Sequence, residues 1–206
     1  MSTIKFEWRK QEKKFYVPKT HPELIEVPSV KYIMLSGKGN PNDGEFSDLV
    51  GVLYSLAYGI KMLPKKGIVP EGCFDYTVYP LEGIWKLENG TNGFDKNNLV
   101  YKIMIRQPEF VTGKIFENVM EMVKKSKPHP KLKDVIFDSV EDGLSVHMMH
   151  IGSYDNEPAS FETMKSFCDT NNLKRADEYH REIYLNDSRK TLTAKLQTVL
   201  RYRVIK

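Results

Sequence analysis

The sequence has few cysteines, no long hydrophobic run and no large excess of one charge, and each absence excludes a class of protein. Cys73 and Cys168 lie far apart without a CxxC pair, so neither a disulfide framework nor a cysteine zinc site is expected. No apolar run approaches the roughly 18 residues of a membrane-spanning helix. The first residues carry charges from Lys5 onward and lack the apolar stretch of a signal peptide. We therefore expect a cytoplasmic protein with no membrane partner.

The charge balance argues against a nucleic-acid partner. Among 206 residues, 31 Lys and Arg face 27 Asp and Glu, which gives a net charge of +4. The basic runs at 9–14 and 124–133 are not interleaved with aromatic residues, as a surface that binds nucleic acid would be. The segment before Glu23 is too short for a helix-turn-helix domain. The sequence leaves the oligomeric state open.

Motifs for metals, phosphates and covalent nucleophiles are also missing. The five histidines form no HxxxH pair, and His147 and His150 are three apart in a predicted strand, so they point to opposite faces. The loop GKGNPNDG lacks the order of a phosphate-binding loop, and no GxSxG is present. Cys168 falls on the apolar face of a predicted helix and is expected in the core. We expect no metal and no cofactor.

Hydrophobic periodicity predicts strands and helices in alternation. Helices are expected at 46–62, around 115–123 and at 157–171; strands are expected in ELIEV, VKYIML, FDYTVYPLEGIWKL, LVYKIMIR, DVIFDSV, LSVHMMHI, EYHREIYL and TVLRYRVI. The first two strands of each half lie close together in the sequence, so each of these two pairs is expected to form a hairpin. The 40% hydrophobic content is typical of a globular domain with a sizeable core.

The two halves have the same order of hairpin, glycine loop, helix, strand and strand. Gly37 and Phe46 are nine residues apart, and so are Gly152 and Phe161. This pattern predicts an α+β fold made of two pseudo-symmetric β-α-β-β modules, although accidental similarity would also explain it.

The expected organisation is an N-terminal arm followed by one domain. The arm would either be disordered or pack through Phe6, Trp8 and Phe15. The boundaries are 1–22 for the arm, 23–206 for the domain, 23–108 for its first module, 109–133 for a connecting helix and linker, and 134–206 for the second module.

Glu182 is the carboxylate that the pattern singles out. By strand alternation it shares a face with His180 and Tyr184. The other face, which runs from Tyr179 to Leu185, is more apolar and is expected to be buried. Glu182 would then point to solvent or into a cleft.

Two further glutamates are candidates with simpler alternatives. Glu157 opens the third helix, where Asp155 or Asn156 can cap it and where the helix dipole also favours a carboxylate. Glu82 lies in PLEGIW, a bent strand end. Taken singly, each of these glutamates is more often a surface charge than a functional residue.

Several segments resemble stand-alone GyrI-like, small-molecule-binding proteins. These segments are SVKYIMLSGKGNPND, YTVYPLEGIW, GSYDNEP and HREIYLND, and the likeness runs from about Glu23 to Ile205. It implies the GyrI-like, or regulatory-factor effector-binding, fold, in which two β-α-β-β (SHS2-type) modules surround a central groove. In regulators with this domain, a glutamate that matches Glu182 lies among aromatics and receives cationic, flat, hydrophobic compounds.

The resemblance also implies an activity. Some stand-alone members hydrolyse strained cyclopropane rings in DNA-alkylating compounds, and the catalytic pair here would be Glu157 and Glu182. The small aromatic ligand would be bound by Tyr79, Glu82, Trp85, Tyr101 and Tyr154. For each of these aromatics, plain core packing is the alternative. The alternative for the whole protein is a non-catalytic binder that sequesters drugs in the same groove.

Overall fold

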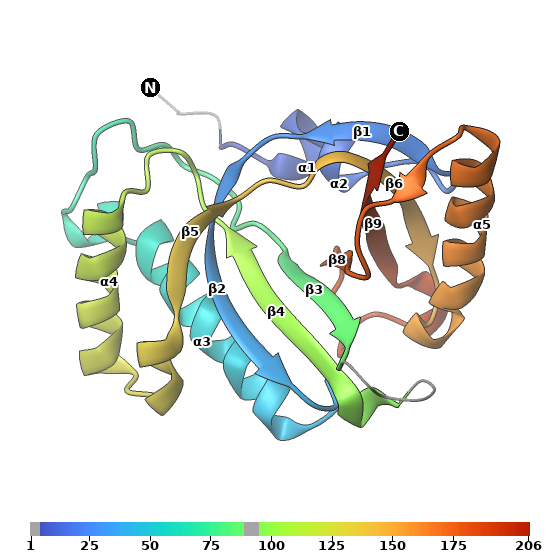
Figure 1. Cartoon of the computed structure of the whole chain (residues 1–206). Coiled ribbons are helices and arrows are strands. Elements are labelled where there is room, and N and C mark those ends of the chain that lie inside the picture. The colour runs from blue at the N-terminus through green and yellow to red at the C-terminus, as the bar shows by residue number, and fades with distance from the viewer. Residues whose placement is uncertain (1–4, 89–94) are drawn as a thin grey trace. The chain divides into compact units, whose positions relative to one another are not determined.

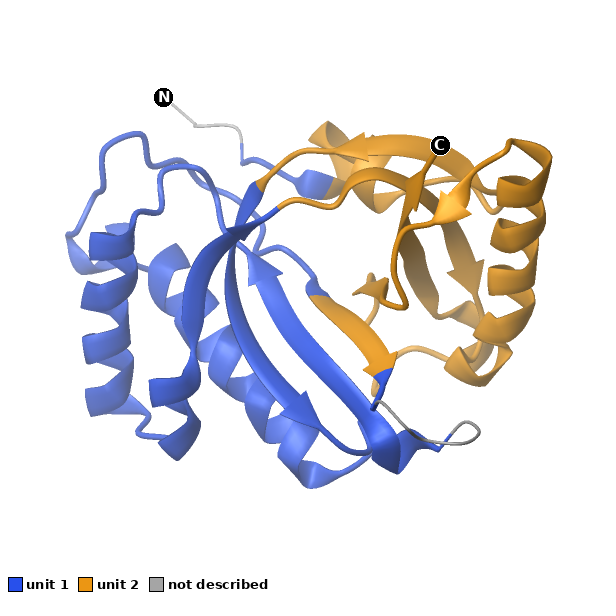
Figure 2. Cartoon of the chain, in the orientation of Figure 1, with its two compact units in different colours: residues 1–8, 30–81, 87–140 blue, residues 9–29, 82–86, 141–206 orange. Residues whose placement is uncertain are grey.

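The computed structural model describes residues 5–88 and 95–206 (Figure 1). The chain divides into two compact units, and each unit is assembled from separate stretches of sequence (Figure 2). Unit 1 comprises Met1–Trp8, Val30–Leu81 and Leu87–Val140; unit 2 comprises Arg9–Ser29, Glu82–Lys86 and Glu141–Lys206. The predicted modules 23–108 and 134–206 are continuous in sequence, whereas each unit combines three separate stretches. The module boundaries therefore stay a prediction.

Unit 1 is an antiparallel sheet with two helices. Its main elements are β2 (Val30–Lys38), α3 (Gly44–Lys61), β4 (Leu99–Arg106), α4 (Gly113–Ser126) and β5 (Ile136–Val140). β2 pairs with β4 on one side and with β5 on the other. α3 packs against β2, β4 and α4, because the apolar face of α3, which includes Leu49, Leu53 and Leu56, is fully buried.

Unit 2 is a longer antiparallel sheet with one helix on it. Its elements are β1 (Glu23–Val27), most of β3 (Leu81–Leu87), β6 (Gly143–Ile151), the 3₁₀ turn η4 (Tyr154–Asn156), α5 (Glu157–Thr170), β7 (Lys174–Arg175), β8 (His180–Tyr184) and β9 (Gln197–Ile205). The strand order is β1-β6-β9-β8-β3, and β7 also pairs with β9. Residues of α5, β6 and β9 form a buried apolar cluster that includes Met164, Leu200 and Cys168, so Cys168 is a core residue as expected.

The predicted α+β class and the repeated element order are confirmed. The chain runs β2-α3-β3-β4 and then β6-α5-β8-β9, and the helices match the predicted spans within a few residues. The expected local hairpins are wrong. β1 pairs with β6, more than a hundred residues away, and β5 pairs with β2. Pro28 and Gly143 interrupt the chain as hairpin turns would, but the strands beside them join different units.

The N-terminal arm is described from residue 5 onward, and residues 1–4 of the predicted arm lie outside the described residues. It contains two short helices, α1 (Trp8–Gln11) and α2 (Lys13–Tyr16). In unit 1, Phe6 forms a β-bridge with Tyr76, and the indole N–H of the buried Trp8 donates to the carbonyl of Val78 at 3.0 Å. In unit 2, the carbonyl of Phe15 accepts a hydrogen bond from Arg201. Of the two alternatives, packing therefore holds for the described part of the arm.

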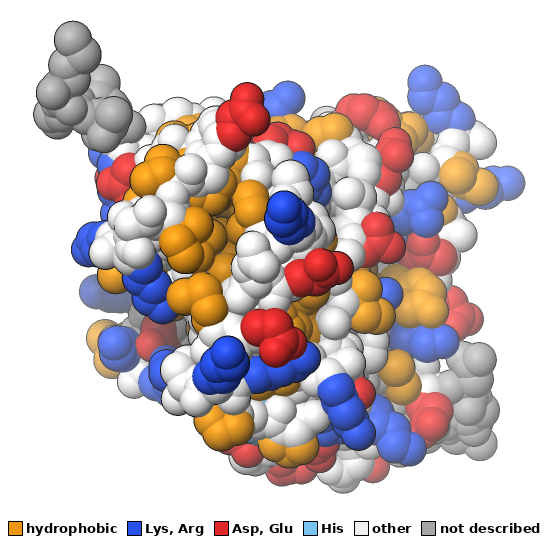
Figure 3. All heavy atoms as spheres, turned by 90° about the vertical axis from the view of Figure 1, so that its left-hand side faces the viewer, with side chains coloured by type: hydrophobic (Ala, Val, Ile, Leu, Met, Phe, Trp, Pro, Cys, Tyr) orange, Lys and Arg blue, Asp and Glu red, His pale blue; other side chains and the backbone are white. Residues whose placement is uncertain are grey.

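Basic and acidic side chains are intermixed on the face of the molecule drawn in Figure 3, and hydrophobic side chains gather between them. This agrees with the small net charge of the sequence. Among the described residues, no helix has both the length and the hydropathy that are needed to cross a membrane.

Candidate functional site

The two faces of the unit 2 sheet carry different chemistry. Glu182 of β8 lies directly across from Leu200 of β9, and Leu200 packs against Met164 of α5. Residues opposite each other in antiparallel strands share a face, so Glu182 lies on the face that α5 covers, here called the α5 face. Arg181 is paired with Arg201 and therefore lies on the opposite face.

Glu182 is held by both of its carboxylate oxygens. Tyr184 Oη donates to Glu182 Oε2 at 2.8 Å, and His180 Nε2 lies 2.9 Å from Glu182 Oε1. Because a carboxylate oxygen accepts, this second contact requires His180 to carry its proton on Nε2. The three residues occupy alternate positions of β8, so the strand itself brings the two donors to the carboxylate. The predicted grouping of these three side chains is confirmed.

Glu157 is placed by the turn that leads from β6 into α5. Gly152 has φ of +129°, a conformation that favours glycine, and starts this turn. His150 then fixes it, because its Nε2 lies 2.9 Å from the Ser153 carbonyl and its Nδ1 lies 2.9 Å from Ser160 Oγ of α5. The Ser153 hydroxyl accepts from the backbone N–H of Asp155. The turn therefore presents Glu157 in a defined position at the first residue of the helix.

Glu157 is buried to an extent that its sequence position does not predict. Only 6% of the residue is exposed, and its Oε1 atom is buried with no hydrogen-bond partner. Burial raises the pKa of Glu157 to about 9, and the negative charges of Glu182 and Asp155 add to the rise. Glu157 therefore carries a proton at neutral pH. Simple helix capping would leave this carboxylate exposed and ionised.

Aromatic rings surround the two carboxylates. Tyr154 meets Tyr184 edge to face, with ring centroids 5.9 Å apart, and Phe161 of α5 meets His180 in the same way at 4.9 Å. Burial raises the pKa of both tyrosines, and the charge of Glu182 raises each further. Both phenols are therefore neutral donors at physiological pH. We call Glu157, Glu182, His180, Tyr184 and Tyr154 the glutamate cluster.

Trp85 lies on the same face as Glu182. β3 is the neighbour of β8, and Glu82 of β3 bonds Arg181, which belongs to the opposite face. Alternation then places Gly83 and Trp85 on the α5 face. The indole covers Gly83 so closely that a Cβ atom there would lie 2.4 Å from Trp85 Nε1. The indole ring therefore packs directly against Gly83, where a larger residue would collide with it.

The opposite face carries a buried network of charges. Arg181 donates from Nε and Nη2 to the two carboxylate oxygens of Asp142 at 2.8 and 2.6 Å, and from Nη1 to Glu82 at 2.9 Å. Arg201 adds a contact to Asp142 at 3.4 Å. Burial alone would raise the pKa of Asp142, but the two guanidinium groups outweigh it and lower that pKa. The network joins β3, β8 and β9 to the turn before β6.

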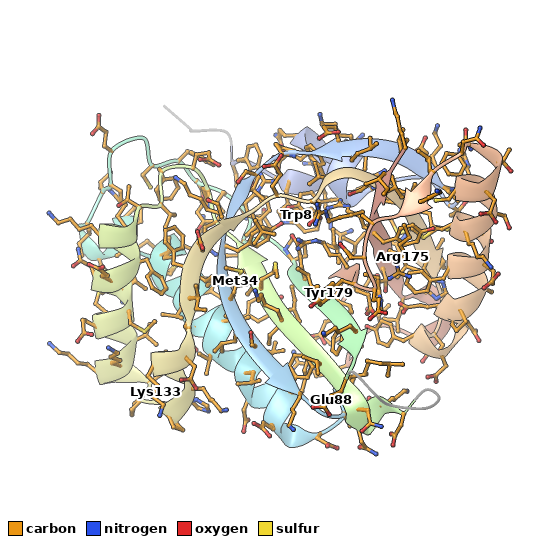
Figure 4. All side chains as sticks on the ribbon, in the orientation of Figure 1. Trp8, Met34, Glu88, Lys133, Arg175 and Tyr179 are labelled. Atoms are coloured by element: carbon orange, nitrogen blue, oxygen red, sulfur yellow. The ribbon has the colours of Figure 1, made fainter. Side chains whose placement is uncertain are left out.

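A histidine on this opposite face is kept neutral. His147 lies across from Arg201, and burial, helped by the charge of Arg201, lowers the pKa of His147 to about 4. Tyr179, labelled in Figure 4, packs its ring against Lys86 Nζ and is 43% exposed. Ile183, which shares the face of Arg181 on β8, is fully buried.

The predicted site residues fall into three groups. Glu157, Glu182 and Tyr154 come together in the glutamate cluster, and Trp85 shares their face. Glu82 is bound to Arg181 on the opposite face. Tyr79 and Tyr101 belong to unit 1: Tyr79 packs on Arg106, and Tyr101 covers Gly37 and meets Phe46 edge to face. Participation of these residues in ligand binding stays a prediction.

Tyr184 and His180 were not among the predicted site residues. The signal was available, because period-two alternation places both on the face of Glu182. What the pattern does not show is that both would turn toward the carboxylate. Among the described residues, no three His, Cys, Asp or Glu side chains are grouped as metal ligands would be.

This chain was compared with protein-family models and with solved structures. The GyrI-like small molecule binding domain matches residues 20–204. Two structures of hydrolases from Listeria innocua are 35% and 36% identical to this chain, with TM-scores of 0.89 and 0.91. A structure of an uncharacterized conserved protein from the same organism is 37% identical, with a TM-score of 0.92. In all three cases 98% of this chain and 100% of the other is covered.

The search of curated proteins found no match. The family match, in contrast, covers nearly the whole chain and agrees with the repeated β-α-β-β order described above. The chain therefore belongs to the family of GyrI-like small-molecule-binding domain proteins.

Proposed function

We propose that this protein is a cytoplasmic hydrolase of xenobiotic defence, which adds water to the strained cyclopropane ring of flat, hydrophobic, DNA-alkylating compounds. The observation that carries the proposal is the pair of carboxylates on the α5 face. Glu157 has a buried oxygen without a partner, and Glu182 lies close enough for its charge to raise the pKa of Glu157. A protein that only attracts a cation needs one ionised carboxylate and gains nothing from a second that is buried and protonated.

The chemistry of such a substrate suits this pair. A cyclopropane conjugated to a dienone is an electrophile, because opening the ring relieves strain and creates an aromatic phenolate. Water becomes nucleophilic enough when a positioned carboxylate takes its proton, and general acid or base catalysis of this kind contributes roughly 10²–10⁴-fold. A protonated carboxyl group beside an ionised one provides a proton donor and a proton acceptor at the same pH.

The aromatic side chains provide the binding surface in this proposal. Tyr154 and Trp85 lie on the same sheet face as Glu182 and would stack on a planar ligand. Ligand binding by Glu82, Tyr79 and Tyr101 is a separate proposal from the sequence, because Glu82 lies on the opposite face of the sheet and the two tyrosines belong to unit 1. The similarity to two Listeria innocua hydrolases supports an enzyme over a non-catalytic binder.

The proposal is tested by detection of the hydrolysis product. The protein is incubated with a cyclopropane-bearing compound of the duocarmycin type, and the ring-opened product, heavier by one water, is followed by mass spectrometry against a protein-free control. Glu157→Gln and Glu182→Gln should each lower turnover by at least roughly a hundredfold, the scale of a lost general base or acid. Glu162→Gln, an exposed carboxylate on the same helix, is the matched control and should keep full activity.

Two outcomes would contradict the proposal. If the compound stays intact but quenches tryptophan fluorescence, the protein is a non-catalytic binder of drugs. If turnover survives both substitutions in the glutamate pair, the carboxylates are structural and the reaction takes place elsewhere.

A further inference from the structure

The two glutamates of the pair have different surroundings. Both oxygens of Glu182 accept hydrogen bonds, from Tyr184 and from His180, as those of an ionised carboxylate do. Glu157 has an oxygen that is fully buried and has no partner. An ionised carboxylate in that position would lose hydration without compensation, whereas a protonated one loses far less. The proton of the pair thus belongs on Glu157.

We propose that Tyr184 and His180 are positioning residues that fix Glu182 as the proton acceptor of the pair and leave Glu157 as its proton donor. This inference rests on the proposed hydrolysis, and it assigns the direction in which protons move. Neither Tyr184 nor His180 needs to touch the substrate, because both act through the carboxylate that they hold.

The reaction balances with these roles. Water attacks the cyclopropane methylene and forms a C–O bond, while its proton passes to Glu182. The C–C bond of the ring breaks, and its electron pair moves into the dienone and creates the phenolate. The phenolate oxygen takes the proton of Glu157. Transfer of the proton from Glu182 back to Glu157, directly or through water, restores the starting state, so the net change is the addition of one water.

The groups around Glu157 favour this assignment. They are Glu182 and Tyr184 from β8 and Asp155 and Tyr154 from η4. His180 acts on Glu182, and His150 holds the turn before the helix. The charges that act on Glu157 are those of Glu182 and Asp155, and both are negative. Negative neighbours and burial act in the same direction and retain the proton on Glu157.

The first experiment reads proton occupancy without any substrate. Side-chain carboxyl ¹³C resonances of glutamate are titrated in the wild type, in Glu157→Gln and in Glu182→Gln. The resonance that titrates near pH 9 should be missing in Glu157→Gln. In Glu182→Gln it should remain and titrate at lower pH, because a negative neighbour is gone. A high-titrating resonance that is lost in Glu182→Gln instead would overturn the proposal.

The second experiment uses the pH dependence of turnover. If Glu157 is the donor, the rate falls as the pH rises through about 9, where Glu157 loses its proton. If Glu157 were the base, the rate would rise through the same pH, and the assignment would be reversed. A wild type without product at any pH would sink the proposed hydrolysis alone, since the carboxyl titration still decides where the proton lies.

The third experiment addresses the two positioning residues. Tyr184→Phe removes a single hydroxyl that bonds a charged group, so kcat should fall roughly 10- to 100-fold with KM nearly unchanged. Tyr179→Phe removes the same atom from a tyrosine just before β8 that packs against Lys86, and should leave kcat unchanged. His180→Gln, which keeps an N–H donor, should be more active than His180→Ala. Wild-type kcat in both Tyr184→Phe and His180→Ala would refute the role of Tyr184 and His180 as positioning residues.

Discussion

Replacing Glu157 by Gln should make the protein more stable, even though the same substitution should lower turnover by at least roughly a hundredfold. The pKa of Glu157 rises from an ordinary value of 4.5 to about 9 in the folded protein. Between these two values the folded state retains a proton that the unfolded chain has released. The free energy of unfolding therefore falls as the pH rises through this window. Gln has the shape of the protonated acid and cannot ionise, so it avoids this loss.

The magnitude follows from the width of the window. At about 1.4 kcal/mol per pH unit, the loss at pH 5 is below about 1 kcal/mol, and at pH 7 it reaches about 3 kcal/mol. Glu157→Gln should therefore resemble the wild type at pH 5 and exceed it in stability by about 3 kcal/mol at pH 7, with a larger gain of about 5 kcal/mol at pH 8. Urea unfolding at the three pH values measures this difference.

The control for this prediction is Glu162→Gln. Glu162 lies on the same helix and is exposed, so its substitution should produce no pH-dependent difference. The reasoning would be refuted if Glu157→Gln were no more stable than the wild type at pH 8, or if its advantage were the same at pH 5 and pH 8. Either result would mean that Glu157 ionises freely in the folded protein. A buried, proton-retaining carboxylate that reduces stability is expected where function, rather than folding, retains it.

Two more substitutions test the packing around the cluster. Gly83→Ala would place a Cβ atom 2.4 Å from Trp85 Nε1. It should therefore destabilise the protein by about 1–3 kcal/mol, and the shifted indole should change its fluorescence. Arg181→Met removes the hydrogen bonds to two buried carboxylates and should cost about 3–5 kcal/mol in urea unfolding. Arg189→Met, at an exposed ion pair, should change stability by less than about 1 kcal/mol. Equal effects of the two arginine substitutions would mean that the network on the opposite face does not hold the strands together.

The local sequence pattern predicted helices and strands such as α3 and β8, but it did not predict which strands pair with each other. The apolar stripe of α3 and the alternation in β8 follow directly from the sequence, because helix and strand periods are properties of neighbouring residues. The pairing of β1 with β6 depends on strands distant in sequence, so a break at Pro28 looked like a hairpin turn. A local sequence pattern does not indicate which distant strand will be the pairing partner.

The site shows the same division. Alternation placed Glu182 with His180 and Tyr184, and the structure agrees. The burial of Glu157 could not be predicted, because the first residue of a helix is usually solvated, whereas this one is buried near Glu182 of β8 and Asp155 of η4. The contact of Glu82 with Arg181 likewise depends on which strand lies beside β8.

By itself, the sequence determined the α+β class, the repeated β-α-β-β order and the grouping of Glu182 with His180 and Tyr184 on one strand face, because these follow from residue periods and from short motifs. Only the tertiary structure decided which strands pair, which of the two glutamates is buried without a partner, and which side chains hold the other. Those properties depend on desolvation and on hydrogen bonds between residues brought together from different parts of the chain, and desolvation is what separates the two carboxylates into a proton donor and a proton acceptor.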